Sequence, residues 1–271
     1  MRVLSALLVF MLATPFAVAD TTGLRRLSDR DDLLGWEAVG RLELAGKGFC
    51  TATLIAPELV LTAAHCVYNK ETNSLLDAGQ VTFRAGLRDG QSIAERKGLQ
   101  IAAHGGFTPG VPMSWTNVRH DVALIRLASP ITSAQANPFI LHDGSTDGAT
   151  VSVTSYGMGR ADALSRQRQC QILAARDELM MFDCDVTYGS SGAPVFARVG
   201  GRGRILSVIS GMAQVEGKKV ALGMALPARV AELKSMLRRG PVAAPDRRVK
   251  RLSVGSGRNS TGAKFIRADG S

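Results

Sequence analysis

The sequence Leu59-Val60-Leu61-Thr62-Ala63-Ala64-His65-Cys66 runs from a short apolar segment into a histidine that is followed at once by a cysteine. The apolar run is typical of a buried strand, and the two small alanines allow a tight turn after it. Cys50 stands sixteen residues before Cys66, so a disulfide between them would fix the histidine on a rigid wall. A solitary histidine is usually a core residue, whereas this neighbourhood makes His65 a candidate general base.

A carboxylate opens a second apolar run, His120-Asp121-Val122-Ala123-Leu124-Ile125-Arg126-Leu127. An aspartate before a buried strand is usually only a turn residue. It can also accept the Nδ1 proton of a histidine, which selects the tautomer whose Nε2 is available as a base. Asp121 is therefore a candidate partner for His65.

The third motif is Tyr188-Gly189-Ser190-Ser191-Gly192-Ala193-Pro194, which alone would pass for a Gly/Ser-rich surface turn. Together the three motifs closely resemble those of chymotrypsin-like serine proteases. They stand in the order His, Asp, Ser of chymotrypsin, which differs from the order in subtilisin or the α/β-hydrolases. By this resemblance Ser191, rather than Ser190, is the nucleophile. The backbone N–H groups of Gly189 and Ser191 would form the oxyanion hole.

The resemblance covers residues 36–237 and implies an all-β fold, a double six-stranded antiparallel β-barrel (chymotrypsin-like) with a C-terminal helix. It implies a secreted serine endopeptidase that hydrolyses peptide bonds through an acyl-enzyme intermediate. The catalytic triad, in the cleft between the barrels, would be His65, Asp121 and Ser191. No cofactor and no metal is implied, because the triad and the oxyanion hole suffice for acyl transfer.

The pattern of apolar runs fits two barrels followed by one helix. Short runs rich in β-branched residues are separated by Gly or Pro about every ten residues, as in sandwiches and barrels. We expect a protease domain over 36–239, with barrels over about 36–130 and 131–225. The helix is expected over 226–239, where apolar residues fall at helical spacing: Val230, Leu233 and Leu237.

The substrate-binding residues follow from the same resemblance. Asp185 lies six residues before Ser191, where trypsin-like members carry the carboxylate that binds Arg or Lys. Glutamyl endopeptidases also carry Asp near this place without preferring basic residues, and Asp185 follows Cys184, so it can equally shape the loop. Ser210 resembles the residue that lines the substrate strand and braces the triad aspartate, although a plain strand-end serine is the alternative. Gly211 would open the pocket wall.

Ser190 departs from the pattern of the animal trypsins. Those enzymes have an aspartate there, which pairs with the N-terminus released on activation. The nearest match to an Ile-Val-Gly-Gly start is Ala38-Val39-Gly40. We therefore expect no activation by that route. Ser190 and Ala193 resemble the bacterial glutamyl-endopeptidase branch, and the small number of cysteines agrees.

The N-terminal residues predict export. Residues 1–19 combine Arg2, an apolar run and a small-x-small site at Ala17-Val18-Ala19, as in a signal peptide, with an uncleaved anchor as the alternative. Residues 20–35 are polar, as in a linker or a pro-segment. We expect a secreted or periplasmic protein, a setting in which disulfides persist. Four cysteines allow three pairings, of which we favour the local ones, Cys50 with Cys66 and Cys170 with Cys184.

The formal charge of +10 is concentrated at the C-terminus. Residues 240–271 carry seven Lys or Arg against two Asp, which is half of the net charge. This composition predicts a basic, disordered tail that is suited to an anionic surface or polymer. We expect no specific recognition of nucleic acid. The other partners are protein or peptide substrates, and we expect a monomer.

Three other functions fit parts of the sequence. A catalytically silent protease homologue would bind peptides or cell-envelope partners through the same cleft, although the intact triad argues against it. An adhesin or cell-envelope binder would act through the basic tail, with proteolysis incidental. An esterase of unrelated fold is disfavoured by the order of the triad and by the lack of a strand–elbow–helix pattern around Ser191.

Overall fold

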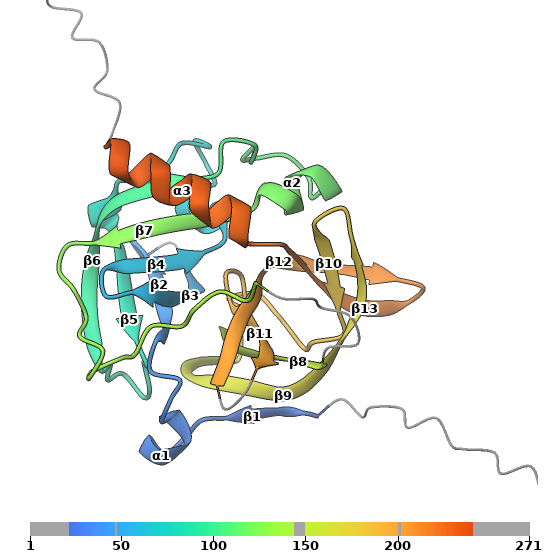
Figure 1. Ribbon diagram of the computed structural model, residues 1–271, viewed down its shortest axis with the longest axis horizontal. Coiled ribbons are helices and arrows are strands. Elements are labelled where there is room, and N and C mark those ends of the chain that lie inside the picture. The colour runs from blue at the N-terminus through green and yellow to red at the C-terminus, as the bar shows by residue number, and fades with distance from the viewer. Residues whose placement is uncertain (1–21, 47, 144–149, 200–201, 241–271) are drawn as a thin grey trace, which may run out of the picture. The chain divides into compact units, whose positions relative to one another are not determined.

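A computed structural model of the chain describes residues 22–46, 48–143, 150–199 and 202–240. The expected signal peptide and nearly all of the basic tail lie outside the described residues. Figure 1 shows two groups of strands, with one long helix, α3, packed across the first group.

The first barrel is a closed antiparallel ring in the order β2-β3-β4-β7-β6-β5. Its strands alternate between side chains in the barrel and side chains at the surface, as a pleated strand must. In β5, for example, Val81, Phe83 and Ala85 are buried while the residues between them are partly exposed. The strands are β2 (Val39–Leu44), β3 (Phe49–Ala56), β4 (Leu59–Thr62), β5 (Val81–Ala85), β6 (Ala94–Ala103) and β7 (Ala123–Leu127).

The second barrel closes through the order β8-β9-β10-β13-β12-β11, because β11 pairs again with β8. The two six-stranded rings confirm the expected double β-barrel. The strands are β8 (Thr150–Gly157), β9 (Arg160–Arg176), β10 (Leu179–Phe182), β11 (Pro194–Val199), β12 (Arg202–Val215) and β13 (Lys218–Met224).

Residues 22–35 form part of the fold, although their polar composition suggested a linker or a pro-segment. Strand β1 (Leu24–Arg26) pairs with the outer edge of β9, opposite Ser165 to Gln167. The short helix α1 (Arg30–Leu33) follows, and Leu33 is buried. The segment therefore covers a strand edge that would otherwise expose unpaired backbone groups.

Helix α3 (Pro227–Arg239) confirms the expected C-terminal helix. It begins at a proline, which is favoured in the first turn, and buries Val230, Leu233 and Leu237 against β6 and β7. The remaining helices are short: η1 (Ala64–Val67), η2 (Ala78–Gln80) and α2 (Trp115–His120). None of the described helices is long and apolar enough to cross a membrane.

Both favoured disulfides are confirmed. Cys50 is bonded to Cys66 in the first barrel, and Cys170 is bonded to Cys184 in the second. The first ties β3 to the turn that carries His65. The second joins β9 to the segment that leads into the Gly189–Gly192 loop.

Candidate active site

His65 sits in the single turn η1, directly after β4, with its backbone and its ring both tied to Asp121. Its Nδ1 lies 2.7 Å from Asp121 Oδ2, and its backbone N–H donates to Oδ1 at 2.8 Å. The neighbouring Ala63 and Ala64 are fully buried, so no larger side chain would fit in this turn. The ring therefore has one orientation, with Nδ1 directed at the carboxylate.

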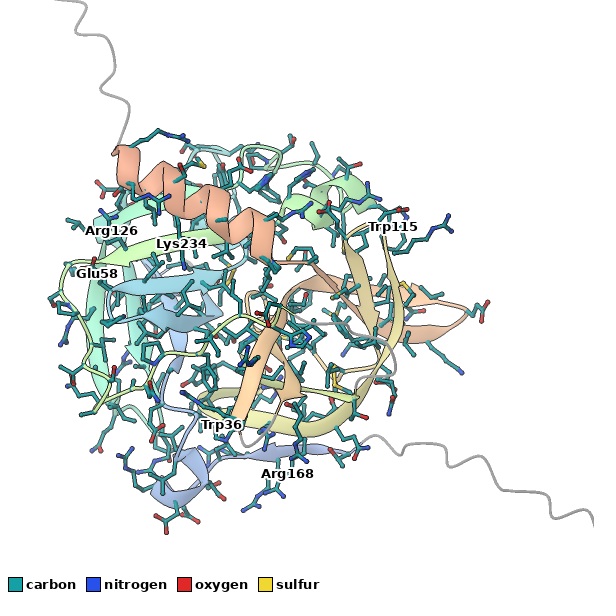
Figure 2. All side chains as sticks on the ribbon, in the orientation of Figure 1. Trp36, Glu58, Trp115, Arg126, Arg168 and Lys234 are labelled. Atoms are coloured by element: carbon teal, nitrogen blue, oxygen red, sulfur yellow. A yellow bond between two sulfur atoms is a disulfide. The ribbon has the colours of Figure 1, made fainter. Side chains whose placement is uncertain are left out.

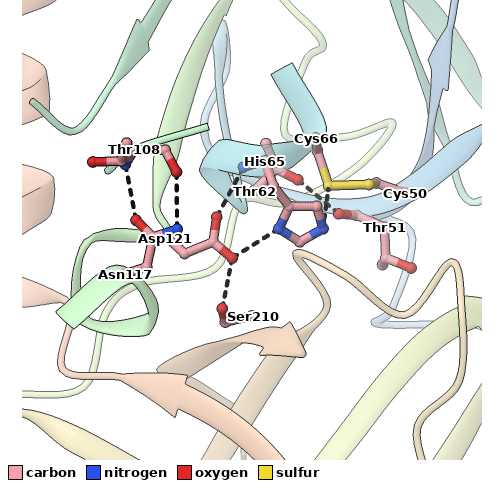
Figure 3. Close-up of polar contacts among 9 residues, drawn as sticks. All are labelled: Cys50, Thr51, Thr62, His65, Cys66, Thr108, Asn117, Asp121 and Ser210. Carbon is pink, nitrogen blue, oxygen red and sulfur yellow. Dashed lines mark hydrogen bonds and ion pairs between the residues drawn. A yellow bond between two sulfur atoms is a disulfide. The ribbon is translucent and has the colours of Figure 1, made fainter. Parts of the chain in front are cut away.

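Asp121 is buried and receives three hydrogen bonds. It follows α2 as the capping residue, and its side chain is 4% exposed. Besides the two donors of His65, the hydroxyl of Ser210 on β12 donates to Oδ2 at 2.6 Å. Figure 3 shows the three contacts meeting at one carboxylate. Three donors on one buried carboxylate fix its orientation.

The surroundings of His65 raise its pKa above the ordinary value of an imidazole. Burial opposes the charged ring, but the negative charge of Asp121 and its hydrogen bond to Nδ1 outweigh that cost. The positive charge of Lys70 acts weakly in the opposite direction. The ring is thus a stronger base than a free histidine, as a general base at neutral pH requires.

The loop that ends at Ser191 depends on glycine at position 189. Gly189 has a φ of +92°, and a Cβ there would lie 2.3 Å from the ring of Phe49. The carbonyl of Gly189 accepts from Thr51 Oγ1 at 2.9 Å, and that of Tyr188 accepts from the Met158 N–H at 2.7 Å. Within the described residues, the backbone N–H groups of Gly189 and Ser191 donate to no protein atom. They are left available as paired donors.

Ser190 points away from the cleft and is fully buried beneath the loop. Its hydroxyl lies 3.1 Å from the Arg160 guanidinium and donates to the carbonyl of Tyr156 at 3.1 Å. Arg160 also donates to the carbonyl and the hydroxyl of Ser155, at 2.6 and 2.9 Å. A burial of this kind excludes Ser190 as the nucleophile. The sequence did not reveal Arg160 as the residue that contacts Ser190. The only signal was that position 190 lacks the aspartate of the animal trypsins, so the loop had to be held by a different contact.

Ser191, His65 and Asp121 line one cavity of about 870 Å³ between the two barrels. Its Lys, Asp, Glu and His residues all come from the first barrel: His65, Lys70, Glu71 and Asp121. The second barrel contributes an uncharged wall that includes Val186, Ile209 and Met212. Gly211 also lines this wall, close to Met113.

His65 and Ser191 share the cavity without a direct hydrogen bond among the described residues. Nε2 of His65 lies 3.7 Å from Cys66 Sγ instead. Catalytic hydrogen bonds are often long before substrate binds, and they tighten in the complex. The third side chain of the expected triad is therefore adjacent to the other two but is not yet bonded to them.

Asp185 is not among the described residues that line the cavity, and its role in binding substrate stays a prediction. Its side chain is 61% exposed and lies 3.5 Å from Lys219 Nζ. Its backbone N–H donates to Oε1 of the buried Gln167 at 2.7 Å. Its charge also offsets the cost of burying Arg160. Position along the chain could not reveal which way this carboxylate points.

Cys50, His65 and Cys66 are close enough in space to suggest a metal site. The two sulfur atoms are joined in a disulfide, so neither is a thiolate that could bind an ion. This group therefore does not fit a metal.

Comparison with known proteins identifies one family. The family model described as Trypsin matches residues 33–235. Brachyurin of Leptuca pugilator is 30% identical over 176 residues, which is 62% of this chain and 71% of that protein. Glutamyl endopeptidase of Bacillus licheniformis is 27% identical over 158 residues, 57% of this chain and 47% of that protein. Clotting factor C of Tachypleus tridentatus is 27% identical over 137 residues, 46% of this chain and 13% of that protein.

Solved structures show a similar fold at low sequence identity. A Glu endopeptidase crystallised in complex with MPD has a TM-score of 0.65 at 17% identity and covers 80% of this chain and 97% of its own. The thermostable serine protease AL20 has a TM-score of 0.59, also at 17% identity, covering 75% and 98%. At this identity the likeness concerns the fold alone.

Proposed function

Because this chain belongs to the trypsin family of serine proteases, we propose that it is a serine endopeptidase whose catalytic triad is His65, Asp121 and Ser191. The observation that carries the proposal is the contact of 2.7 Å between His65 Nδ1 and the buried carboxylate of Asp121, in the cavity that Ser191 also lines. This contact supports the proposal because it favours the tautomer that leaves Nε2 as the base.

The reaction begins when Ser191 Oγ attacks the carbonyl carbon of a peptide bond. Its proton passes to His65 Nε2, and the N–H groups of Gly189 and Ser191 hold the oxygen that becomes negative. The imidazolium then returns the proton to the leaving amine, which departs and leaves an ester on Ser191. A water molecule, deprotonated by the same nitrogen, hydrolyses that ester and restores the hydroxyl. The carboxylate of Asp121 orients the ring and stabilises the imidazolium.

The substrates we propose carry an apolar side chain on the acyl side of the bond that is cut. That side chain would lie against the wall beside Ser191, which is made by residues such as Val186, Ile209 and Met212. Among the residues of the second barrel that the structure describes, no Lys, Arg, Asp or Glu lines the cavity there. A charged side chain would lose its hydration without gaining a partner, so apolar substrates are favoured.

The two disulfides and the leader-like first residues support an oxidising compartment, secreted or periplasmic. We include this location in the proposal. It also agrees with a protease whose substrates are other proteins outside the cytoplasm.

Labelling with a fluorophosphonate probe tests the nucleophile. The purified wild-type protein should be labelled, Ser191→Ala should not, and Ser190→Ala should still be labelled, because Ser190 lies beneath the loop. Absence of labelling in the wild type, or labelling that survives in Ser191→Ala, would reject the triad. A silent homologue that binds peptides would give the first of these results.

The substrate class is tested with a set of peptides that differ only in the residue on the acyl side of the cleaved bond. We expect kcat/KM for Leu or Phe at that position to exceed the values for Arg and Glu by about a hundredfold. Asp185→Asn is the matched variant and should leave the ratio of Leu to Arg unchanged. A preference for Arg that disappears in Asp185→Asn would overturn the apolar assignment while leaving the triad intact.

A further inference from the structure

A second cavity, of about 850 Å³, lies beside β1 and shares no lining residue with the active-site cavity. Figure 2 labels two of its residues, Trp36 and Arg168, on the side of the molecule where β1 runs along β9. Strands β8, β9, β11 and β12 supply much of the lining. Its aromatic side chains are Trp36, Phe139 and Phe196, whose rings pack against one another with centroids 4.6 to 5.7 Å apart.

Four arginines converge on this cavity: Arg166 and Arg168 from β9, Arg198 from β11 and Arg202 from β12. The guanidinium of Arg166 lies 4.1 Å from the centre of the Trp36 ring, and that of Arg202 lies 4.2 Å from the centre of the Phe139 ring. The aromatic rings therefore hold two of the four flat cations in place.

None of the four forms an ion pair with a carboxylate in the described part of the chain. Arg202 donates to two backbone carbonyls, and Glu37 is near enough to favour its charge. Arg166 Nε is buried and has no hydrogen-bond partner. Arg96 and Arg119 also have a buried Nε without a hydrogen-bond partner. Arg229, in contrast, is paired through both terminal nitrogens with Glu178.

Burial, and to a lesser extent the neighbouring positive charges, disfavour the charged form of Arg166. Burial lowers the pKa of Arg166 to about 10, and the positive charges of Arg168 and Arg198 contribute to the same shift. A guanidinium is almost always fully charged in proteins, so a shift in this direction marks a group short of negative charge. An anion placed among the arginines would remove that repulsion.

We propose that this cavity binds a ligand that carries phosphate or sulfate groups. The flat guanidinium presents two parallel N–H donors that match the oxygens of such groups. Four cations suit a ligand with more than one negative charge, and the volume is typical of small-molecule sites. The groups could belong to a soluble polyphosphate or to the headgroups of an anionic lipid, because the chemistry of recognition is the same.

Trp36 provides a local readout, because its ring lies in the lining of this cavity. The chain has two tryptophans, and Trp115 is 52% exposed on α2, so Trp115→Phe leaves Trp36 as the sole indole in an otherwise full-length protein. We expect sodium tripolyphosphate to change the Trp36 emission in a saturable manner, since it would alter the cation stacked on the ring. A parallel titration with phosphatidylglycerol vesicles separates the two sources of the anion.

Two double variants in this background decide the assignment. Arg168→Gln/Arg198→Gln removes two exposed cations that line the cavity, and Arg238→Gln/Arg239→Gln removes two exposed cations at the end of α3. Both lower the formal charge by two. We expect at least about tenfold weaker binding in the first and less than about twofold change in the second. Equal weakening in both, or no saturable change in Trp36 emission with either ligand, would overturn the proposal. Thermal unfolding without ligand verifies that each variant is folded.

Discussion

The cleft that contains His65 and the cavity that contains Arg166 both bury ionisable groups, and they differ in what neutralises the charge. In the cleft, the carboxylate of Asp121 accepts three hydrogen bonds from its own chain. In the cavity, the guanidinium of Arg166 is partly buried over Trp36, Arg168 and Arg198 add positive charge nearby, and its Nε has no hydrogen-bond partner. The charge of Asp121 is therefore compensated within the protein. The positive charge at Arg166 would be compensated by the proposed anionic ligand.

This difference predicts opposite responses to substitution. Removal of a partner in the cleft leaves a buried charge or donor without compensation, which is costly. Removal of a neighbour in the cavity relieves repulsion. The comparison is therefore tested by changing one charged or polar group at a time in each region.

Asp121→Asn should have the largest effect. The amide cannot accept the Nδ1 proton in the same way, so His65 would take the wrong tautomer and kcat would fall by about 10⁴-fold with the fold retained. The loss in kcat is measured by steady-state hydrolysis of a peptide that has an apolar residue at the cleaved bond. Ser210→Ala removes only one of the three donors to Asp121 and serves as the milder control. A loss below tenfold in Asp121→Asn would mean that the carboxylate does not orient the base.

Arg160→Met tests whether the contact between Arg160 and Ser190 holds the loop that carries Ser191 in place. We expect kcat to fall by about tenfold to a hundredfold with a smaller change in KM, because Ser190 lies between the two N–H donors of Gly189 and Ser191. Loss of hydrogen bonds from a charged group should also destabilise the protein by about 2 kcal/mol.

Arg160→Lys separates positioning from stability. The ammonium keeps the positive charge but loses the fork that reaches both Ser155 and Ser190. If this variant regains stability without regaining kcat, Arg160 positions the loop. If kcat and stability recover in parallel, its role is structural only.

The sequence was sufficient for the parts of the site that consist of local motifs. The motifs around His65, Asp121 and Ser191 predicted that the three residues share a cleft, and all three line one cavity. The spacing of the cysteines allowed three pairings, and the favoured local pairs, which close short loops, are the ones that form. The helix over 226–239 was likewise legible from its apolar spacing. These features do not depend on which distant side chain lies nearby.

The parts that the sequence did not predict depend on contacts between distant residues. The polar composition near Leu24 hid β1, whose stability comes from pairing with β9 at residues 165–167. Asp185 stands at a position typical of substrate binding, yet Gln167 and Lys219 hold it at the surface. The four cavity arginines are scattered over three strands, so no local pattern relates them.

Lys70→Ala should shift the pH profile of the cleft without changing its maximum. Lys70 lowers the pKa of His65, so its removal raises that pKa further above the ordinary imidazole value. The base must be neutral, and activity is lost as pH falls through this pKa. The acid limb of kcat/KM should therefore move to higher pH in Lys70→Ala. Lys234→Ala is the control, because Lys234 is a lysine of α3 that does not line the cavity. An unmoved limb in Lys70→Ala would show that the charge is screened.

Arg168→Gln should produce the smallest effect, and its sign distinguishes the two regions. Because Arg168 repels Arg166, its removal should stabilise the ligand-free protein by a few tenths of a kcal/mol, about 1 °C in Tm, in low-salt buffer without phosphate. Added NaCl should raise the Tm of the wild type more than that of the variant, since salt screens the repulsion. Arg176→Gln is matched on the same strand but removes an arginine 3.6 Å from Asp177, so it should not stabilise. If Arg168→Gln lowers Tm as Arg160→Met does, the arginines of the cavity are partnered within the chain, and the contrast with the cleft fails.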